Sequence, residues 1–300
     1  MIRRTLLALT LLACLGSDLS ARDFYVNNLI GDDRHDGGTP ELVSDRVGPM
    51  RSITRALKAA QPGDRIIVTN TGRAYRECLT LQGRRHGSDG SRNFQIIGNG
   101  SVIDGRVPVD AQAWRHDFGE VFSFKPHLQG QQILYLDDKP LAQSRVANEQ
   151  ELAELEAMQW AWFEGRVYFR GEKDRLPDYY DLSYCGHAVG ITLYEVRGIE
   201  ISDLTVQGFQ LDGISAHDDV QEASIVGCIL RGNARSGVHV GGASRVTVEA
   251  CLIGDNNQAQ VHCSDYCRVT LSNCDVLDTE PAAPPVVAED TVRLEQVDNQ

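Results

Sequence analysis

The sequence predicts a right-handed parallel β-helix, an all-β solenoid with an N-terminal capping helix and a mid-chain insertion. Three sets of short apolar strands recur at steps of 23 or 24 residues between residues 190 and 278. The first strands begin at Gly190, Gly213, Gly237 and Gln260, the second at Ile199, Ala223, Val246 and Val269, and the third at Leu204, Cys228, Cys251 and Cys274. No unit could bury its apolar residues alone, so we expect like strands to stack in parallel at about 4.8 Å per rung.

The repeat also predicts which side chains face the core. Every second residue of a strand points inward, so Ile191, Ile214, Val238 and Val261 form a buried column and Thr192, Ser215, His239 and His262 an outward one. Cys228, Cys251 and Cys274 share one inward position, and their parallel side chains about 4.8 Å apart suit a reduced ladder better than disulfides. Asn233 and Asn256 predict a stacked amide ladder at one turn.

The N-terminus is typical of an export signal. Arg3 and Arg4 precede the apolar run from Leu6 to Ala13, which is too short to remain as a membrane-spanning helix. Two endings are open: a lipoprotein signal over residues 1–13 that leaves Cys14 as a lipid anchor, or a signal peptide over residues 1–21. We expect an exported protein that is secreted, periplasmic or lipid-anchored at the cell surface.

The charge balance limits the ligands. The formal net charge is −13 at pH 7, which argues against nucleic acid and against unaided binding of acidic glycans. We expect a monomer. Cys263 and Cys267 flank one turn and could pair or bind a metal, and one C-x3-C spacing does not decide between the two.

Residues 22–105 predict the N-terminal cap and the first coils. Ile53, Ala56, Leu57 and Ala60 give one apolar face on a helix that Pro62 and Gly63 end. An open solenoid end must be covered, and this helix is placed to cover it. Short strands follow over residues 65–68, 77–81, 94–97 and 101–103.

This opening segment resembles a known superfamily. The run Phe24-Tyr-Val-Asn-Asn, the segment 48–68 from Gly48-Pro-Met-Arg-Ser to Asp-Arg-Ile-Ile-Val, and Tyr75-Arg-Glu77 are similar to the start of secreted bacterial pectin-lyase-like β-helix proteins. The resemblance covers residues 23–105, and residues 181–279 by their repeat pattern. It implies the β-helix architecture and a polysaccharide as ligand or substrate, whereas a shared fold does not fix one activity.

The limits of the insertion, the regular coils and the tail follow from where the sequence repeat stops and starts. Residues 106–180 carry no repeat and are expected to form an insertion packed on the coils, with the aromatic residues Trp160, Trp162 and Phe163 buried in it rather than stacked on sugars. Regular coils then fill residues 181–279. The Pro-rich segment 280–300 is expected to be a C-terminal tail.

One turn of the repeat places carboxylates in a column. Glu195, Asp218 and Asp265 occupy the same position on different rungs, with Gly242 between the last two. Carboxylates on adjacent rungs would lie about 5 Å apart, close enough to share Ca²⁺. The alternative is a column of solvated turn residues without metal.

His239 and His262 are the candidate catalytic residues. They lie on adjacent rungs of the outward column, where a neutral imidazole could take a proton. Residues 174–300 contain no Lys, so the base of a polysaccharide lyase would be an Arg or a His. A glycoside hydrolase is less favoured, because Asp212, Asp218 and Asp219 crowd one coil instead of following successive coils. The competing hypothesis is a non-catalytic glycan-binding or surface module.

Overall fold

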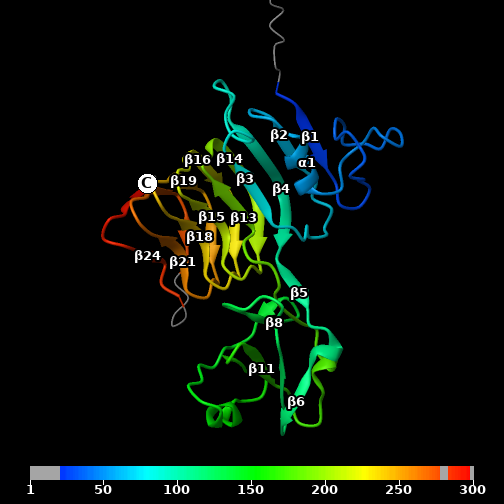
Figure 1. The fold of residues 1–300 in the computed structure, drawn as a ribbon, viewed down its shortest axis with the longest axis vertical. Helices are drawn as coiled ribbons and strands as arrows, with labels where there is room; N and C mark the ends of the chain where they lie inside the picture. Colours follow the sequence, from blue (N-terminus) through cyan, green and yellow to red (C-terminus); the bar gives the residue numbers. More distant parts are fainter. Residues whose placement is uncertain (1–20, 278–282, 298–300) are drawn as a thin grey trace, which may run out of the picture.

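The computed structural model describes residues 21–277 and 283–297, and these form a parallel β-helix with one α-helix and one insertion. Figure 1 shows the coils stacked side by side, with the insertion as a separate lobe at their edge. The predicted export signal and Cys14 lie outside the described residues. Within the described part of the chain, no helix is long and apolar enough to cross a membrane.

The first strands of the repeat build one parallel sheet. Its order is β3 (Leu79–Gln82), β13 (Ile191–Tyr194), β15 (Asp212–His217), β18 (Ser236–Val240), β21 (Ala259–Cys263) and β24 (Val286–Ala288). The register is the predicted one, since Ile214 pairs with Ile191 and Val238, and His239 pairs with His262. This β3–β24 sheet carries the predicted outward column.

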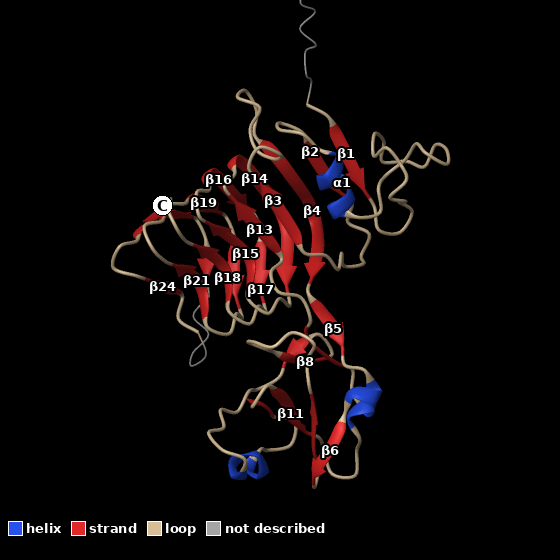
Figure 2. Cartoon of the chain, viewed as in Figure 1, coloured by secondary structure: helices blue, strands red, loops and turns tan. Residues whose placement is uncertain are grey.

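The second and third strands build the other long sheet. Its order is β1 (Asp23–Val26), β2 (Arg65–Val68), β4 (Phe94–Asp104), β14 (Arg197–Gln207), β16 (Gln221–Val226), β19 (Arg245–Glu249), β22 (Arg268–Ser272) and β25 (Arg293–Val297). The third strands extend it as β17 (Ile229–Arg231), β20 (Leu252–Gly254) and β23 (Asp275–Val276). Figure 2 shows both sheets running the length of the solenoid.

The inward columns fuse into one hydrophobic core that runs from Phe24 to Leu271. Helix α1 (Ile53–Ala59) is capped by Ser52, whose hydroxyl accepts a hydrogen bond from the Arg55 amide. The helix buries Ile53 and Leu57 against β1, β2 and β3. The predicted cap is therefore confirmed. An uncovered solenoid end would expose both apolar side chains and an unpaired strand edge.

The asparagine ladder forms as predicted, and the predicted burial of the cysteine ladder holds for two of its three members. Asn233 and Asn256 are buried, and Asn233 Nδ2 donates to Asn256 Oδ1 at 3.0 Å. Cys228, Cys251 and Cys274 are free thiols, and the first two are buried while Cys274 at the end of the stack is half-buried. Parallel stacking at one rung spacing explains both ladders.

The segment expected to be a tail adds another rung instead. β24 pairs with β21, and β25 pairs with β22, in the same parallel register as earlier coils. Pro284 and Pro285 directly precede β24 and do not end the solenoid. This corrects our assignment of residues 280–300.

The insertion is built from antiparallel strands. One sheet has the order β10 (Trp160–Phe163), β11 (Arg166–Arg170), β7 (Val121–Phe124) and β6 (Arg115–Phe118), and the other β5 (Arg106–Pro108), β12 (Leu182–Cys185), β8 (Leu134–Leu136) and β9 (Lys139–Pro140). Three short 3-10 helices are Ala111–Ala113, Gln150–Glu154 and Pro177–Tyr179. Trp160 is buried, and Trp162 and Phe163 are half-buried, so the aromatic residues pack the insertion.

The strands before the insertion pair directly with the strands after it. β3 pairs directly with β13, with Leu79 opposite Ile191, and β4 pairs with β14. The insertion meets the coils at their turns rather than on a sheet face: Ile133, Tyr135, Cys185 and Ala234 form one small apolar cluster there. This position makes the insertion a wall beside the β3–β24 sheet.

Candidate functional site

The two predicted histidines stack on adjacent rungs of the β3–β24 sheet. The ring centroids of His239 and His262 are 5.1 Å apart, with an angle of 22° between the ring planes. His239 Nδ1 lies 3.1 Å from Ser215 Oγ, and its Nε2 lies 3.3 Å from Ser264 Oγ. His262 Nδ1 is buried and has no hydrogen-bond partner among the described residues.

Burial controls the protonation of both rings. It lowers the pKa of His239 to about 4, against a smaller opposing attraction from Asp212. Burial also lowers the pKa of His262, and the positive charge of Arg235 adds to that effect. Both imidazoles are therefore neutral at neutral pH, and each has one donor and one acceptor nitrogen.

A buried ion pair lies at the start of the same strands. Asp212 is fully buried, accepts a hydrogen bond from Arg235 Nε at 2.9 Å and accepts another from Ser236 Oγ at 2.6 Å. The sequence analysis treated Asp212 only as a poor match to a hydrolase motif and did not consider Arg235. The repeat could have indicated this pair, because Asp212 lies opposite Ser236 on the next rung and Arg235 directly precedes Ser236.

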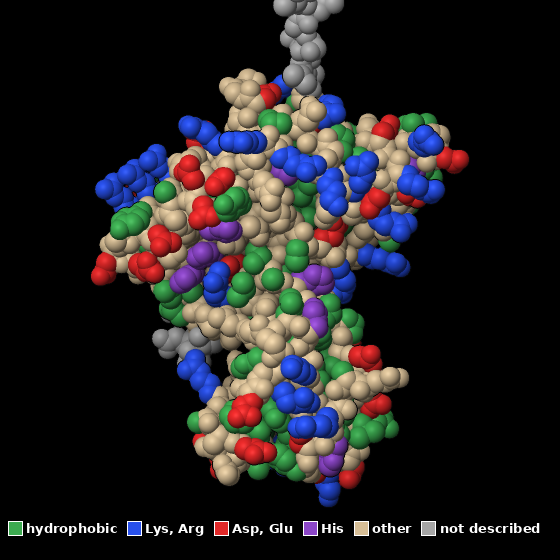
Figure 3. All heavy atoms as spheres, in the orientation of Figure 1, with side chains coloured by type: hydrophobic (Ala, Val, Ile, Leu, Met, Phe, Trp, Pro, Cys, Tyr) green, Lys and Arg blue, Asp and Glu red, His purple; other side chains and the backbone are tan. Residues whose placement is uncertain are grey.

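A cleft separates the insertion from the turns of the last coils. Its volume is about 970 Å³, and its polar lining comes from both sides: Gln143, Arg145, Asp255, Asn257 and Gln258. Gln258 precedes His262 by four residues, which is about 13 Å along a strand. Figure 3 shows histidine side chains in a row on this face, and the surface is hollowed toward the insertion. Sequence reasoning missed this cleft, because the residues of the insertion follow no repeat.

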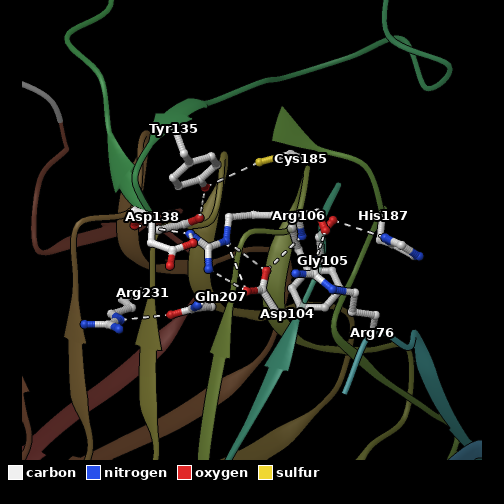
Figure 4. A network of polar contacts seen from close by, with 12 residues as sticks. Arg76, Asp104, Gly105, Arg106, Tyr135, Asp138, Cys185, His187, Gln207 and Arg231 are labelled. Carbon is white, nitrogen blue, oxygen red and sulfur yellow. Dashed lines mark hydrogen bonds and ion pairs between the residues drawn. The ribbon is translucent and has the colours of Figure 1, made fainter. Parts of the chain in front are cut away.

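A polar network fixes the wall of the cleft to the coils. Arg106 on β5 is buried and donates to both carboxylate oxygens of Asp104, while Gln207 Nε2 donates to Asp104 Oδ2 at 3.1 Å (Figure 4). Burial alone would raise the pKa of the Asp104 carboxyl, but these donors lower it overall. Tyr135 on β8 reaches the carbonyl oxygen of Gly232 from the insertion side.

The acidic column has a conformational explanation. Glu195, Asp218, Gly242 and Asp265 all have positive φ angles, between 48° and 69°. The turn thus requires a left-handed residue on each rung, a position that favours Gly, Asn and Asp. Asp265 Oδ2 also accepts a hydrogen bond from the Gly242 amide at 2.9 Å.

The column does not gather into a metal cage. Over residues 21–277 and 283–297, no group of three or more His, Cys, Asp or Glu side chains could hold a metal ion. Binding of Ca²⁺ by Glu195, Asp218 and Asp265 stays a prediction without support from the geometry. Cys263 and Cys267 are both buried free thiols in the structure.

Comparison with known proteins identifies the fold. A family model described as the right handed beta helix region matches residues 183–295. A glycoside hydrolase structure aligns with a TM-score of 0.59 at 10% identity, covering 85% of this chain and 73% of that one. XylC in complex with xylose gives a TM-score of 0.46 at 11% identity, covering 91% of this chain and 69% of the other. Curated proteins give no significant match.

The chain folds as a right-handed parallel β-helix. This confirms the predicted fold class, including its handedness. The likeness to the glycoside hydrolase, at 10% identity, establishes the shared fold and nothing about activity. Export, the pectin-lyase-like activity and the roles of individual residues therefore stay predictions.

Proposed function

We propose that this protein binds a polysaccharide across the β3–β24 sheet, with His239 and His262 at the centre and the cleft beside the insertion as the continuation of the site. The observation that carries the proposal is the stacked pair of neutral imidazoles on the outward column of the β3–β24 sheet, with a cleft lined by amides about 13 Å away along the strands. Sugar hydroxyls both donate and accept hydrogen bonds, which suits neutral imidazoles and the amides of Gln143 and Asn257.

The electrostatics favour binding over proton transfer at His239. An imidazole whose pKa is lowered to about 4 is neutral at neutral pH but is a weak base. Its two nitrogens already face Ser215 and Ser264. We assign His239 to positioning a sugar hydroxyl and its neighbour His262, rather than to accepting a proton.

A second candidate function is a polysaccharide lyase, which the state of His262 favours. Its neutral ring is half-buried on the outward column, and the charge of Arg235 lies close enough to lower the pKa of His262. In β-elimination, His262 would take the proton α to a uronate carboxylate while the C4–O bond to the neighbouring sugar breaks, and water would protonate the leaving oxygen. Arg235 is already paired with Asp212, so a bound Ca²⁺ would be needed to neutralise the uronate carboxylate.

We further propose that the protein acts after export, on the basis of Arg3, Arg4 and the apolar run that follows them. Such a location would give it access to extracellular glycans. Fractionation of the producing cells, with a Cys14→Ser variant to test lipid anchoring, checks this part of the proposal independently of ligand binding.

A panel of uronate and neutral polysaccharides tests the proposed function. Binding is measured by calorimetry with and without Ca²⁺, and cleavage by the appearance of unsaturated ends. We expect at least one polymer to bind with a Kd below about 1 mM. Failure of every polymer to bind at that level would contradict the proposal, and unsaturated products would select the lyase over the binding module.

A further inference from the structure

A ladder of arginines lies on the other long sheet. Arg245, Arg268 and Arg293 pair with one another in register on β19, β22 and β25, and all three side chains are exposed. Like strands are about 4.8 Å apart, so three guanidinium groups project in a row from neighbouring rungs. Figure 3 shows basic side chains stacked in such a row near the last strands.

The acid nearest in register to Arg245 already has another partner. Glu222 lies opposite Arg245 on the preceding rung, but it forms its ion pair with Arg197. Within the described residues, no ion pair joins Arg245, Arg268 or Arg293 to an acid, although Glu295 follows Arg293 by two residues. In a chain with a net charge of −13, three adjacent exposed cations without an ion-pair partner make a locally positive patch.

The residues beside the ladder suit a sugar chain. Thr247 and Thr270 follow Arg245 and Arg268 by two residues, so their hydroxyls face the same side of the sheet. Tyr266 precedes Arg268 by two residues and is 74% exposed. An exposed phenol ring offers a flat apolar face with a polar tip. The surface thus combines cations and hydroxyls, with Glu295 next to Thr270 on the last rung and the exposed ring of Tyr266 in the turn before β22.

We infer that Arg245, Arg268 and Arg293 bind an acidic polysaccharide, with Tyr266 stacking on a sugar ring. Guanidinium groups bind carboxylates and sulfates through paired hydrogen bonds. A pyranose unit advances along an extended chain by a distance similar to one rung, so one acidic group could meet each arginine. This surface lies on a different sheet from the histidines and does not require the proposed function to hold.

Charge density favours a polysaccharide over a nucleic acid. Duplex DNA carries a negative charge about every 1.7 Å along its axis and would be repelled strongly by the acidic remainder of the protein. An acidic polysaccharide has about one charge per sugar and suffers less of that repulsion. The ladder therefore gives local attraction that the net charge alone would not predict.

The test measures binding of the mature protein to polygalacturonate, alginate and dextran sulfate, with uncharged dextran as the matched polymer. We expect binding to at least one acidic polymer that weakens as salt rises. The variant Arg245→Gln/Arg268→Gln/Arg293→Gln should bind about tenfold more weakly, as the loss of three exposed charge contacts implies. Tyr266→Ala should weaken binding at high salt as well as at low salt.

A charge-matched control carries Arg46→Gln/Arg73→Gln/Arg84→Gln, three exposed arginines of the N-terminal region. It should bind like the wild type. Equal losses in both triple variants, no binding to any acidic polymer, or tighter binding to duplex DNA would overturn the inference. A His239→Ala/His262→Ala variant run in parallel separates the two surfaces, because it should keep the salt-dependent binding even if the proposed function fails.

Discussion

The coils and the insertion bury their apolar residues in different ways. In the coils, one core continues from rung to rung, and each inward residue stacks on its equivalent 23 or 24 residues away. In the insertion, antiparallel strands enclose separate small clusters, one around Trp160 and Phe169 and another around Leu152 and Tyr168. The first arrangement is repetitive and the second is local.

This difference separates structural residues from candidate ligand residues. Where the same side chain recurs along a column, as with Asn233 and Asn256, stacking explains it. Where the residue type changes along a column, as from Thr192 to His239 and His262, stacking alone does not explain the new residue type. The proposed site lies on the β3–β24 sheet where such a change occurs on two adjacent rungs.

The largest expected effect is at the junction of the two regions. Arg106→Ala would leave the Asp104 carboxylate buried without its cation, which we expect to lower the free energy of unfolding by about 3–5 kcal/mol. Denaturant unfolding measures this. The control Arg175→Ala removes an exposed ion pair with Glu172 and should cost less than about 0.5 kcal/mol. Similar losses in both variants would show that the junction does not depend on this pair.

Two core truncations test whether the regions unfold as one unit. Ile225→Ala in the coils and Leu152→Ala in the insertion each remove a fully buried side chain, at an expected cost of about 3 kcal/mol. We expect Ile225→Ala to shift the main unfolding transition and Leu152→Ala to produce an earlier, smaller one, because the insertion has its own clusters. A single transition shifted equally by both variants would contradict this separation.

A smaller effect is expected from pH at the histidine pair. Burial lowers the pKa of His239 to about 4 in the folded protein, so the unfolded chain binds a proton that the folded one does not. The native state should therefore lose about 2 kcal/mol as pH falls from about 6.5 toward 4. His239→Gln should remove most of that loss. An unchanged pH dependence of the unfolding free energy in this variant would show that the ring is not held neutral by burial.

The repeat predicted most of the coils and little of the insertion. Inward and outward columns, the cap and both ladders follow from apolar spacing, because stacking makes each rung a copy of the last. The cleft could not be predicted, since Gln143 and Arg145 meet Asn257 only through contacts distant in sequence. For the acidic column, spacing alone left a Ca²⁺ site and a row of solvated turn residues open, because it does not reveal that the turn adopts a left-handed conformation on each rung. The Arg235–Asp212 ion pair could have been predicted from the same repeat, because the two residues lie on adjacent rungs.

The most direct test of the account is the affinity of the double variant His239→Ala/His262→Ala for the best polymer in the panel. Both side chains point outward, so the variant should fold like the wild type, and Thr80→Ala/Thr192→Ala on the same column of earlier rungs is the matched control. We expect the histidine variant to bind at least about tenfold more weakly, which corresponds to about 1.4 kcal/mol, and the threonine variant to change little. Wild-type affinity and cleavage in the histidine variant would place the site elsewhere.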